Sequence, residues 1–441
     1  MTISRVLVLG SGGREHALAW RLARDPGQPR VFVAPGNDGM ARAFERLDVS
    51  DTDPAAVVRA ARDAQVDLVV VGPESALAAG VSDALVAAGL PVFGASRAAA
   101  QLESSKWFAK EVMREAGVPT ARAFACTSEA EADAAFAALG APHVVKADGL
   151  AAGKGVLVTA DLGAARAFAR ECLGGGRFGP QARVVIEEYL QGEEASLIAI
   201  CDGTRHLLLP PARDHKRAFD GDAGPNTGGM GAIAPAPAVS AAVERATSEQ
   251  VVTPMLHAMA ARGTPYRGAL YVGVMVRSGD ARGEHPVAVV EFNARFGDPE
   301  TQAMLPLVSG DFAGLLAGAA RGALEPERVA RASGAAVTVA LVDEGYPERT
   351  LGTGTIAGLD ALEGRDGLFV FHAGTRREVD AWRVKGGRAA YVTALGRDRG
   401  DACERAYAAC ATLGGAHWRM RRDIGVGPGV PAATQHDEGG Q

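Results

Sequence analysis

Uninterrupted apolar runs alternate with helical patterns over roughly the first hundred residues. The runs are VLVL (6–9), VFVA (31–34) and LVVV (68–71), and amphipathic stretches such as DPAAVVRAARDAQ (53–65) separate them. Strands that are apolar on both faces and joined by helices are typical of a parallel sheet covered by helices on each side. We therefore expect residues 1–104 to form a doubly wound α/β domain, with ligands at the carboxyl ends of its strands.

The pattern changes near residue 104. The stretch SSKWFAKEVMREAG (104–117) predicts a helix that ends at Gly117, and mixed strands and helices follow to about residue 325. A third block begins near GAAVTVALV and carries short strands such as LFVFH and AAYVTALG up to about residue 425. From residue 427 onward the chain is rich in Gly and Pro without an apolar period, which predicts a disordered tail. The length of 441 residues also favours about three domains.

Composition excludes several classes of protein. A formal net charge of −6 with mixed signs argues against a nucleic-acid-binding surface. No apolar stretch approaches the 18 or so residues of a membrane span, and no signal segment is visible, so we expect a cytoplasmic protein without membrane partners. The five cysteines form no CxxC pair, which disfavours a disulfide framework or a zinc site. Only six of the 46 basic residues are lysines, so each lysine is examined for a function.

The first predicted strand ends in GSGGREH (10–16), a glycine turn at the start of a helix. Free backbone N–H groups there suit a phosphate, although a simple tight turn or a dinucleotide site would use the same pattern. A dinucleotide fingerprint would need a third glycine where Glu15 stands, and an acid after the second strand, where APGN stands. In VGPE, Glu74 follows another strand at the same edge and could either bond a ligand hydroxyl or cap a helix.

The stretch VVKADGLAAGKGV (144–156) reads as a strand, a glycine-rich turn and a second strand. It differs from a phosphate-binding P-loop in two ways. It has three residues between its first two glycines where the P-loop has four, and Gly155 stands where the P-loop has a Ser or Thr hydroxyl. We expect a β-hairpin with Lys146 in the strand and Lys154 on a tip lying over a phosphorylated ligand. The alternative is a surface hairpin with two solvated lysines.

Glu291 and Asn293 lie two residues apart in the extended run VAVVEFNARFGDPETQ (287–302), so both side chains leave the same face. One carboxylate and one amide oxygen suit magnesium, which keeps waters and borrows phosphate oxygens. Arg295 continues that face and could grip a carboxylate or an oxyanion. A purely structural strand is the alternative.

Two further segments are less decisive. In RVVIEEYLQGEEASL, Glu187 and Glu194 could serve adenine and ribose recognition, although periodicity alone favours a solvated acidic turn. The glycine-rich segment 213–232 places Asp214 and Lys216 in a long polar loop, which indicates a function unless the loop is disordered. The nine histidines show no metal-binding spacing.

These motifs occur in the order seen in the phosphoribosylamine–glycine ligase family of the ATP-grasp superfamily, which the chain resembles over about residues 4–425. The resemblance implies a Rossmann-like N-terminal domain (1–104), an ATP-grasp domain (105–328) with a lid subdomain at about 121–192, a small β-rich C-terminal domain (329–426) and a tail (427–441). It also implies ATP-dependent ligation of glycine to 5-phosphoribosylamine through glycyl phosphate, the second step of purine synthesis, by a monomer.

The resemblance further implies roles for individual residues. Catalytic roles fall to Arg295, Asp214 and Lys146, and Mg²⁺ or Mn²⁺ would bind to Glu291 and Asn293. Many superfamily members also use an acid on the preceding strand, which GALYVGVMV lacks, so the number of metal ions stays open. The implied ATP contacts are Lys106, Lys146, Gly153, Lys154, Gly155, Glu187, Glu188, Tyr189, Leu190 and Glu194. The implied substrate contacts are Gly10, Gly12, Gly13, Arg14, Glu74, Lys216, Asn226, Thr227, Gly228 and Arg295.

Three rival interpretations remain. A related enzyme could activate formate or bicarbonate, and the run DHKR…GPNTGGMGA is the feature that favours glycine instead. A dehydrogenase would rest on GSGG alone, and a nucleotide-binding regulator would need no turnover.

Overall fold

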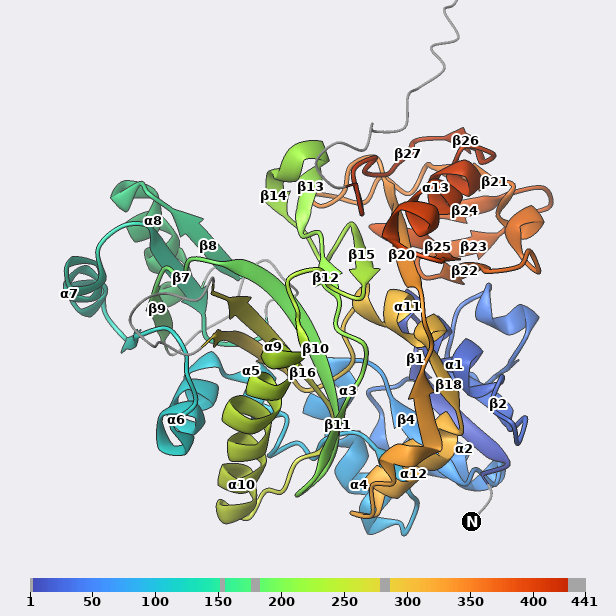
Figure 1. Ribbon diagram of the computed structural model, residues 1–441, viewed down its shortest axis with the longest axis horizontal. Helices are drawn as coiled ribbons and strands as arrows, with labels where there is room; N and C mark the ends of the chain where they lie inside the picture. The colour runs from blue at the N-terminus through green and yellow to red at the C-terminus, as the bar shows by residue number, and fades with distance from the viewer. Residues whose placement is uncertain (1–2, 151–154, 176–182, 278–285, 427–441) are drawn as a thin grey trace, which may run out of the picture.

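The structure is a computed structural model, which describes residues 3–150, 155–175, 183–277 and 286–426. Its N-terminal domain is a five-stranded parallel sheet in the order β3-β2-β1-β4-β5, with helices packed against it (Figure 1). The strands are β1 (Arg5–Gly10), β2 (Arg30–Pro35), β3 (Glu45–Arg46), β4 (Leu68–Val71) and β5 (Val92–Phe93). The predicted doubly wound sheet is confirmed.

Helix boundaries in this domain follow local signals. Helix α1 (Gly13–Leu22) starts directly after the glycine turn, and α2 (Pro54–Asp63) starts where Asp53 accepts a hydrogen bond from the Ala56 N–H. The single helix expected near 76–88 is instead two helices, α3 (Glu74–Ala78) and α4 (Val81–Ala87). Gly80 lies between them at φ 82°, a left-handed conformation that breaks the helix.

The central domain has an antiparallel sheet in the order β11-β10-β16-β17. Its strands are β10 (Glu193–Asp202), β11 (His206–Leu208), β16 (Arg267–Val276) and β17 (Val287–Asn293). The helices of this region are α5 (Gln101–Ser104), α6 (Lys106–Ala116), α9 (Ala241–Thr247), α10 (Thr253–Ala261), α11 (Glu300–Met304) and α12 (Phe312–Ala320). Helix α6 ends at Gly117 in the left-handed conformation, as predicted. Beyond α11, β18 (Val308–Gly310) pairs with β19 (Val329–Arg331).

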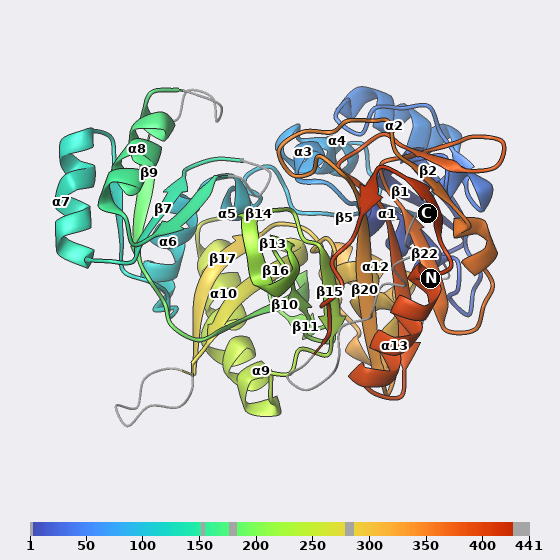
Figure 2. The same ribbon diagram turned by 90° about the horizontal axis from the view of Figure 1, so that it is seen from above.

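A second antiparallel sheet, in the order β6-β9-β7-β8, forms a small subdomain with helices α7 and α8. Figures 1 and 2 both show it standing to one side of the rest of the molecule. Its elements are β6 (Ala123–Cys126), α7 (Glu129–Leu139), β7 (His143–Ala147), β8 (Val156–Thr159), α8 (Leu162–Leu173) and β9 (Val184–Glu188). We call this segment, residues 121–192, the small subdomain.

The C-terminal domain contains a sheet in the order β12-β15-β20-β25-β22 and a smaller one in the order β23-β24-β21-β26. The polar segment 213–232, expected to be a long loop, instead contributes β12 (Arg213–Asp214), β13 (Arg217–Phe219), β14 (Ala223–Asn226) and β15 (Gly231–Ala234). The remaining elements are β20 (Ala335–Asp343), β21 (Thr355–Ala357), β22 (Leu368–His372), β23 (Thr375–Arg377), β24 (Trp382–Val384), β25 (Arg388–Gly396), α13 (Arg399–Cys410), β26 (Gly414–Ala416) and β27 (Trp418–Arg419). The expected mixture of α/β and α+β architecture is confirmed.

None of the helices in the described ranges combines the length and apolar character that crossing a membrane requires.

Candidate functional site

Strand β17 carries the predicted metal ligands. Its neighbour β16 places Gly273 opposite Glu291 and Tyr271 opposite Asn293. A Cβ on Gly273 would lie 3.1 Å from Cγ of Glu291, so the glycine leaves room for that carboxylate. Burial pushes the pKa of Glu291 up, but Lys216, Lys146 and Lys106 outweigh it and hold the pKa below the usual range. The carboxylate is therefore charged at neutral pH.

Lys216 connects two of the predicted ligand-binding carboxylates. Its ammonium makes a short ion pair with Glu194 and lies 3.7 Å from Oε1 of Glu291. Burial alone would lower the pKa of Lys216, yet Glu194 and the nearby groups raise it well above its usual value. A fixed positive charge thus sits between the proposed ribose and metal carboxylates.

Lys146 joins the two antiparallel sheets. Its side chain starts on β7 of the small subdomain, and its ammonium donates to the Val290 carbonyl on β17 at 2.9 Å. The same ammonium lies 3.0 Å from Oε2 of Glu187, which Lys110 also approaches at 3.2 Å. Burial lowers the pKa of Lys110 to about 8, although Glu187 pulls it upward. Sequence reasoning missed Lys110, and the scarcity of lysines was the signal that could have found it.

The predicted hairpin is confirmed, since β7 and β8 pair antiparallel with Lys146 opposite Val156. Its base is tied to the start of α6. The ammonium of Lys106 donates to the Gly149 carbonyl at 3.1 Å, and Asp148 accepts from the Trp107 N–H at 3.1 Å. The Ala147 N–H donates to the Gly155 carbonyl at 2.8 Å. Gly153 and Lys154 on the expected tip lie outside the described residues.

The segment expected to meet adenine follows β9. The carboxylate of Glu188 is held by Arg122, whose N–H and Nε donate at 2.9 and 2.7 Å. Leu190 is buried against Ala121, whereas Tyr189 is 45% exposed. The Glu187 side chain is occupied by the two lysines. The adenine contact stays a prediction.

Arg295 lies where β17 meets the N-terminal domain. Its Nε donates to Oε2 of Glu74 at 3.1 Å, and its Nη2 lies 3.2 Å from Oε1 of Glu103. Burial raises the pKa of Glu103, and Arg295 opposes that rise. Glu103 also accepts from the Ala294 N–H at 2.8 Å, which fixes the chain directly before Arg295. Arg295 and Glu74, both predicted substrate contacts, are thus brought together.

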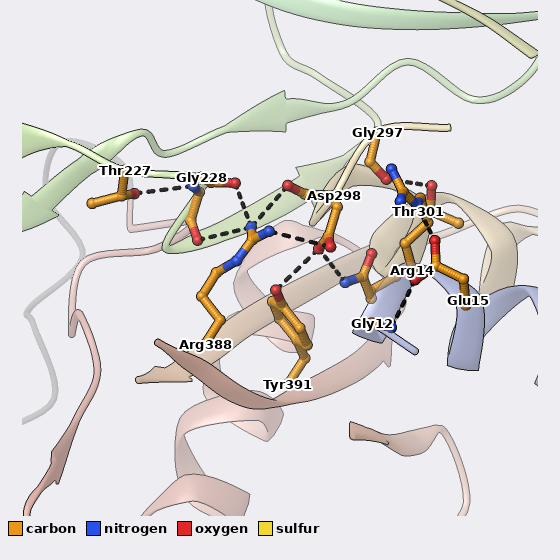
Figure 3. Close-up of polar contacts among 12 residues, drawn as sticks. Gly12, Arg14, Glu15, Thr227, Gly228, Gly297, Asp298, Thr301, Arg388 and Tyr391 are labelled. Atoms are coloured by element: carbon orange, nitrogen blue, oxygen red, sulfur yellow. Dashed lines mark hydrogen bonds and ion pairs between the residues drawn. The ribbon is translucent and has the colours of Figure 1, made fainter. Parts of the chain in front are cut away.

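The glycine turn after β1 packs against two side chains, Glu15 of the same motif and the distant Tyr391. A Cβ on Gly10 would lie 2.5 Å from Cγ of Glu15, and one on Gly13 would lie 2.3 Å from the Tyr391 ring. Glu15 accepts from the Gly12 N–H at 2.8 Å and also pairs with Arg14 (Figure 3). The glycines therefore permit close approach of protein groups as well as exposing a helix N-terminus.

Asp298 is a junction that sequence reasoning missed (Figure 3). Its carboxylate accepts from the Tyr391 hydroxyl at 3.0 Å and from Nε2 of Gln302 at 2.8 Å, and it lies 3.2 Å from Nη2 of Arg388. Arg388 also donates to the Gly228 carbonyl. Asp298 lies in the EFNARFGDPETQ motif, but Arg388 and Tyr391 lie some ninety residues later in the chain. No local motif links them to Asp298, so the sequence did not reveal the junction.

Asp214 has a carboxylate oxygen whose hydrogen-bonding capacity is not used within the described residues. Its Oδ1 is buried and, among the described residues, has no hydrogen-bond partner. Burial, reinforced by Glu300, raises the pKa of Asp214 well above its usual value, while Lys216 and Arg388 oppose the rise. Nearby, Thr227 donates from its N–H and its hydroxyl to the Lys216 carbonyl, both at 2.8 Å. A buried acid with an unused oxygen can accept a small ammonium group.

The chemistry of the donors suits a divalent cation that shares its shell with phosphate. Glu291 and Asn293 offer two hard oxygens on one face, and within the described ranges no cluster of three or more His, Cys, Asp or Glu forms a separate metal cage. Asn226, the remaining predicted contact, lies in β14 opposite Arg217.

Comparisons with known proteins agree with this arrangement. Three family models match in succession, the N domain (4–103), the ATP-grasp (A) domain (104–301) and the C domain (336–427) of phosphoribosylglycinamide synthetase. The phosphoribosylamine–glycine ligase of Streptomyces coelicolor is 49% identical, with 95% of this chain and 98% of the relative covered. The corresponding enzyme of Caulobacter vibrioides is 46% identical, with 95% and 97% covered.

Solved structures show the same relationship. The crystal structure of phosphoribosylamine–glycine ligase from Thermotoga maritima superposes with a TM-score of 0.81 at 31% identity, covering 95% of this chain and 100% of that one. A biotin carboxylase domain from Hydrogenobacter thermophilus reaches a TM-score of 0.67 at 17% identity, covering 95% and 92%, which shows a shared fold alone. The chain therefore belongs to the phosphoribosylglycinamide synthetase family of ATP-grasp ligases.

Proposed function

We propose that this chain joins glycine to 5-phosphoribosylamine with ATP, giving glycinamide ribonucleotide, ADP and phosphate by way of glycyl phosphate. Its close relatives carry the name of this activity over nearly their full length. The structural observation that carries the proposal is the contact of Lys146 with the Val290 carbonyl. It joins the hairpin that would hold phosphates to the strand that would hold the metal, at the residue before Glu291.

Glycine must be activated because its carboxylate is a poor electrophile. Positive charge is also needed, because the negative triphosphate repels that carboxylate. Lys106 and Lys146 approach the same region from α6 and β7, and both lower the pKa of Glu291 by their charge. In the proposal these two ammonium groups hold the α- and β-phosphates while the γ-phosphoryl group faces glycine. Positioning and preorganised charge supply most of the catalysis in reactions of this kind.

Glycine would be oriented through both of its ends. The buried oxygen of Asp214 suits the ammonium group, and Arg295 suits the carboxylate, provided that Arg295 exchanges one of its bonds to Glu74 or Glu103. The amino group of phosphoribosylamine would then attack glycyl phosphate from the side of the N-terminal domain. Its proton would pass to the leaving phosphate or to water, so no general base is assigned.

Glu291 and Asn293 would hold Mg²⁺ or Mn²⁺, which neutralises phosphate oxygens and aligns the phosphoryl group when bound. Lys216 affects this site because its ammonium already pairs with Glu291 and Glu194. In the proposal Lys216 is the internal counter-charge that keeps the two carboxylates compatible before nucleotide and metal arrive. We propose a monomer with domains at 1–104, 105–328 and 329–426, acting on small molecules in the cytoplasm.

The test is an ADP-release assay with purified protein. ADP should form only when glycine and phosphoribosylamine are both supplied, and turnover with formate or bicarbonate in place of glycine would contradict the proposal. Glu291→Gln should lower turnover by about 10³-fold or more, because one ligand charge is lost while shape is kept. Its circular dichroism spectrum without ligands should match that of the unmodified protein. A non-catalytic nucleotide-binding regulator predicts no turnover in either protein.

A further inference from the structure

The hairpin of β13 and β14, residues 217–226, has little support of its own. Its two strands pair with each other and, within the described ranges, with no third strand. Its one large apolar side chain, Phe219, is 49% exposed. In Figures 1 and 2 the hairpin lies between the small subdomain and the C-terminal domain. Because an isolated two-stranded hairpin is marginally stable in water, contacts from outside the hairpin must hold it.

The turn of the hairpin also has an unfavourable backbone conformation. Gly221 and Asp222 both have left-handed φ values, 69° and 52°. Glycine adopts this conformation freely, but a residue with a side chain does so at a cost in free energy. A conformation of this kind persists where surrounding contacts impose it. The turn therefore points to a specific partner for Asp222.

Arg421, which follows β27 in the C-terminal domain, is that partner. Its side chain is 1% exposed, and its Nη1 donates to Oδ1 of Asp222 at 2.7 Å and to the Arg217 carbonyl at 3.1 Å. Its Nε and Nη2 donate to the two carboxylate oxygens of Asp423, each at 2.7 Å. One guanidinium thus joins the first strand and the turn of the hairpin to the segment 421–423.

Backbone groups complete the connection. The Gly221 N–H donates to Oδ2 of Asp423 at 2.9 Å, and the Arg422 N–H donates to Oδ1 of Asp220 at 2.7 Å. Burial opposes the charge of Arg421, but its bonds to the aspartates outweigh burial and raise the pKa of Arg421 above the usual value. The hairpin is therefore held by a buried group that is always charged.

The base of the same hairpin carries predicted substrate contacts. Lys216 directly precedes Arg217, and Asn226 pairs with Arg217 across the hairpin. The N–H and the hydroxyl of Thr227 both donate to the Lys216 carbonyl at 2.8 Å. A displacement of the Arg217 carbonyl would therefore move all three predicted contacts together.

The charge of Arg421 also reaches this segment. His215 lies between Asp214 and Lys216, and burial, reinforced by Arg421 and Arg213, lowers the pKa of His215 to about 4. Arg421 is thus linked to the predicted substrate contacts both through the backbone of the hairpin and through its charge.

We propose that Arg421 is a positioning residue for the glycine substrate. By fixing the hairpin 217–226, it holds Lys216, Asn226 and Thr227 in the arrangement that glycine requires, and it acts through the hairpin rather than on the substrate itself. The inference rests on the proposed function, because it takes glycine as the substrate of this segment.

The test uses Arg421→Gln, Asp222→Asn and the double variant. The Asp222 side chain is 55% exposed, and asparagine keeps its size and tolerates the left-handed conformation, so this variant should fold. Each single change should raise the KM for glycine about tenfold, because the hairpin loses a charge-assisted hydrogen bond. The kcat and the KM values for ATP and phosphoribosylamine should change less than about threefold, since those substrates rely mainly on groups outside the hairpin. The double variant should be no worse than Arg421→Gln, because both changes break the same contact.

Two controls separate positioning from general stability. Arg421→Lys keeps the charge but not the planar fork, so it should recover part of the glycine affinity. The matched control Asp401→Asn breaks the ion pair with Arg397 at the start of α13 and should leave the KM for glycine unchanged. Equal changes in all the kinetic constants, or additive effects in the double variant, would overturn the inference.

A second readout distinguishes this inference from the proposed function. Calorimetric titration with glycine, in the presence of Mg²⁺ and a non-hydrolysable ATP analogue, should show about tenfold weaker binding to Asp222→Asn than to the unmodified protein. If the unmodified protein binds glycine but does not turn it over, the proposed function fails, and weaker binding by the variant still supports the role of Arg421. Equal glycine binding by the two proteins would overturn the inference while leaving the proposed function in place.

Discussion

The small subdomain and the remainder of the molecule differ in how their cores are built. The small subdomain buries an apolar cluster of its own, including Phe136, Val145 and Ile186. In the remainder, which we call the body, the clusters cross domain boundaries. Leu9 of the N-terminal sheet shares one with Leu270 of the central sheet, and Val8 shares the other with Val339 of the C-terminal domain.

The contacts between these two regions are mostly polar. They include the Lys146–Val290, Lys106–Gly149 and Trp107–Asp148 hydrogen bonds, the Lys110–Glu187 ion pair and a small apolar patch of Ala121, Leu190 and Ala288. A region with its own core and a polar joint can shift as a unit, whereas one that shares its core cannot. The polar joint also contains the lysine expected to hold phosphate. Nucleotide binding and the position of the small subdomain should therefore be coupled.

The largest expected effect comes from breaking one core and sparing the other. Phe136→Ala removes a ring that is 3% exposed and should destabilise the small subdomain by about 3–5 kcal/mol. Hydrogen exchange should increase in peptides from residues 121–192 and stay unchanged elsewhere. The matched variant Phe312→Ala, in the body, should increase exchange across all three domains. If both variants increased hydrogen exchange equally throughout the protein, the division into two regions would be contradicted.

Acid should weaken the body through its buried histidines. Burial lowers the pKa of His16 to about 4 and lowers that of His372 well below its usual value. Both residues must stay neutral in the fold, so their contribution is present above the unfolded pKa of about 6.5 and is lost as pH falls toward 4. For His16 alone the loss is on the order of 3 kcal/mol. Denaturant unfolding at pH 7 and pH 4 measures it, and a His16→Gln variant with the same pH dependence would contradict this account.

Lys146→Met should break the joint itself. Loss of the ammonium removes the hydrogen bond to Val290 and a phosphate contact, so kcat/KM for ATP should fall about 10²-fold. The fold should persist, because Glu187 keeps Lys110 as a partner. Arg122→Gln serves as the control, since it removes a more exposed charge from the same subdomain and should change kcat/KM less than twofold. Similar losses in both variants would mean that Lys146 acts only through general charge.

The smallest effect concerns metal binding in the absence of nucleotide. Lys216→Met removes the positive charge beside Glu291, so the affinity for Mn²⁺ alone should rise about tenfold. Electron paramagnetic resonance of free Mn²⁺ measures this without any turnover. An unchanged or weaker Mn²⁺ affinity would show that Lys216 does not serve as the counter-charge.

Local patterns predicted the parts of the site that lie within single elements. Period-two alternation put Glu291 and Asn293 on one face of β17, and the glycine-rich turn between apolar runs gave the β7–β8 hairpin. The apolar runs likewise predicted the parallel N-terminal sheet.

Features that depend on distant partners could not be predicted in this way. Within segment 213–232, β15 forms a strand because it pairs with β20, about a hundred residues later in the chain. The junction of Asp298, Arg388 and Tyr391 likewise exists only after the C-terminal domain has packed. Arg14 likewise donates a hydrogen bond to the distant Phe296 carbonyl. The GSGGREH motif therefore could not show that the Arg14 side chain is already occupied.

The proposed mechanism requires that the hairpin of the small subdomain and strand β17 of the body act on the same nucleotide. Hydrogen exchange with and without a non-hydrolysable ATP analogue and Mg²⁺ tests it directly. Peptides covering β7, β9 and β17 should become protected together and at the same nucleotide concentration. Protection of β17 while β7 and β9 exchange as fast as in the free protein would contradict it.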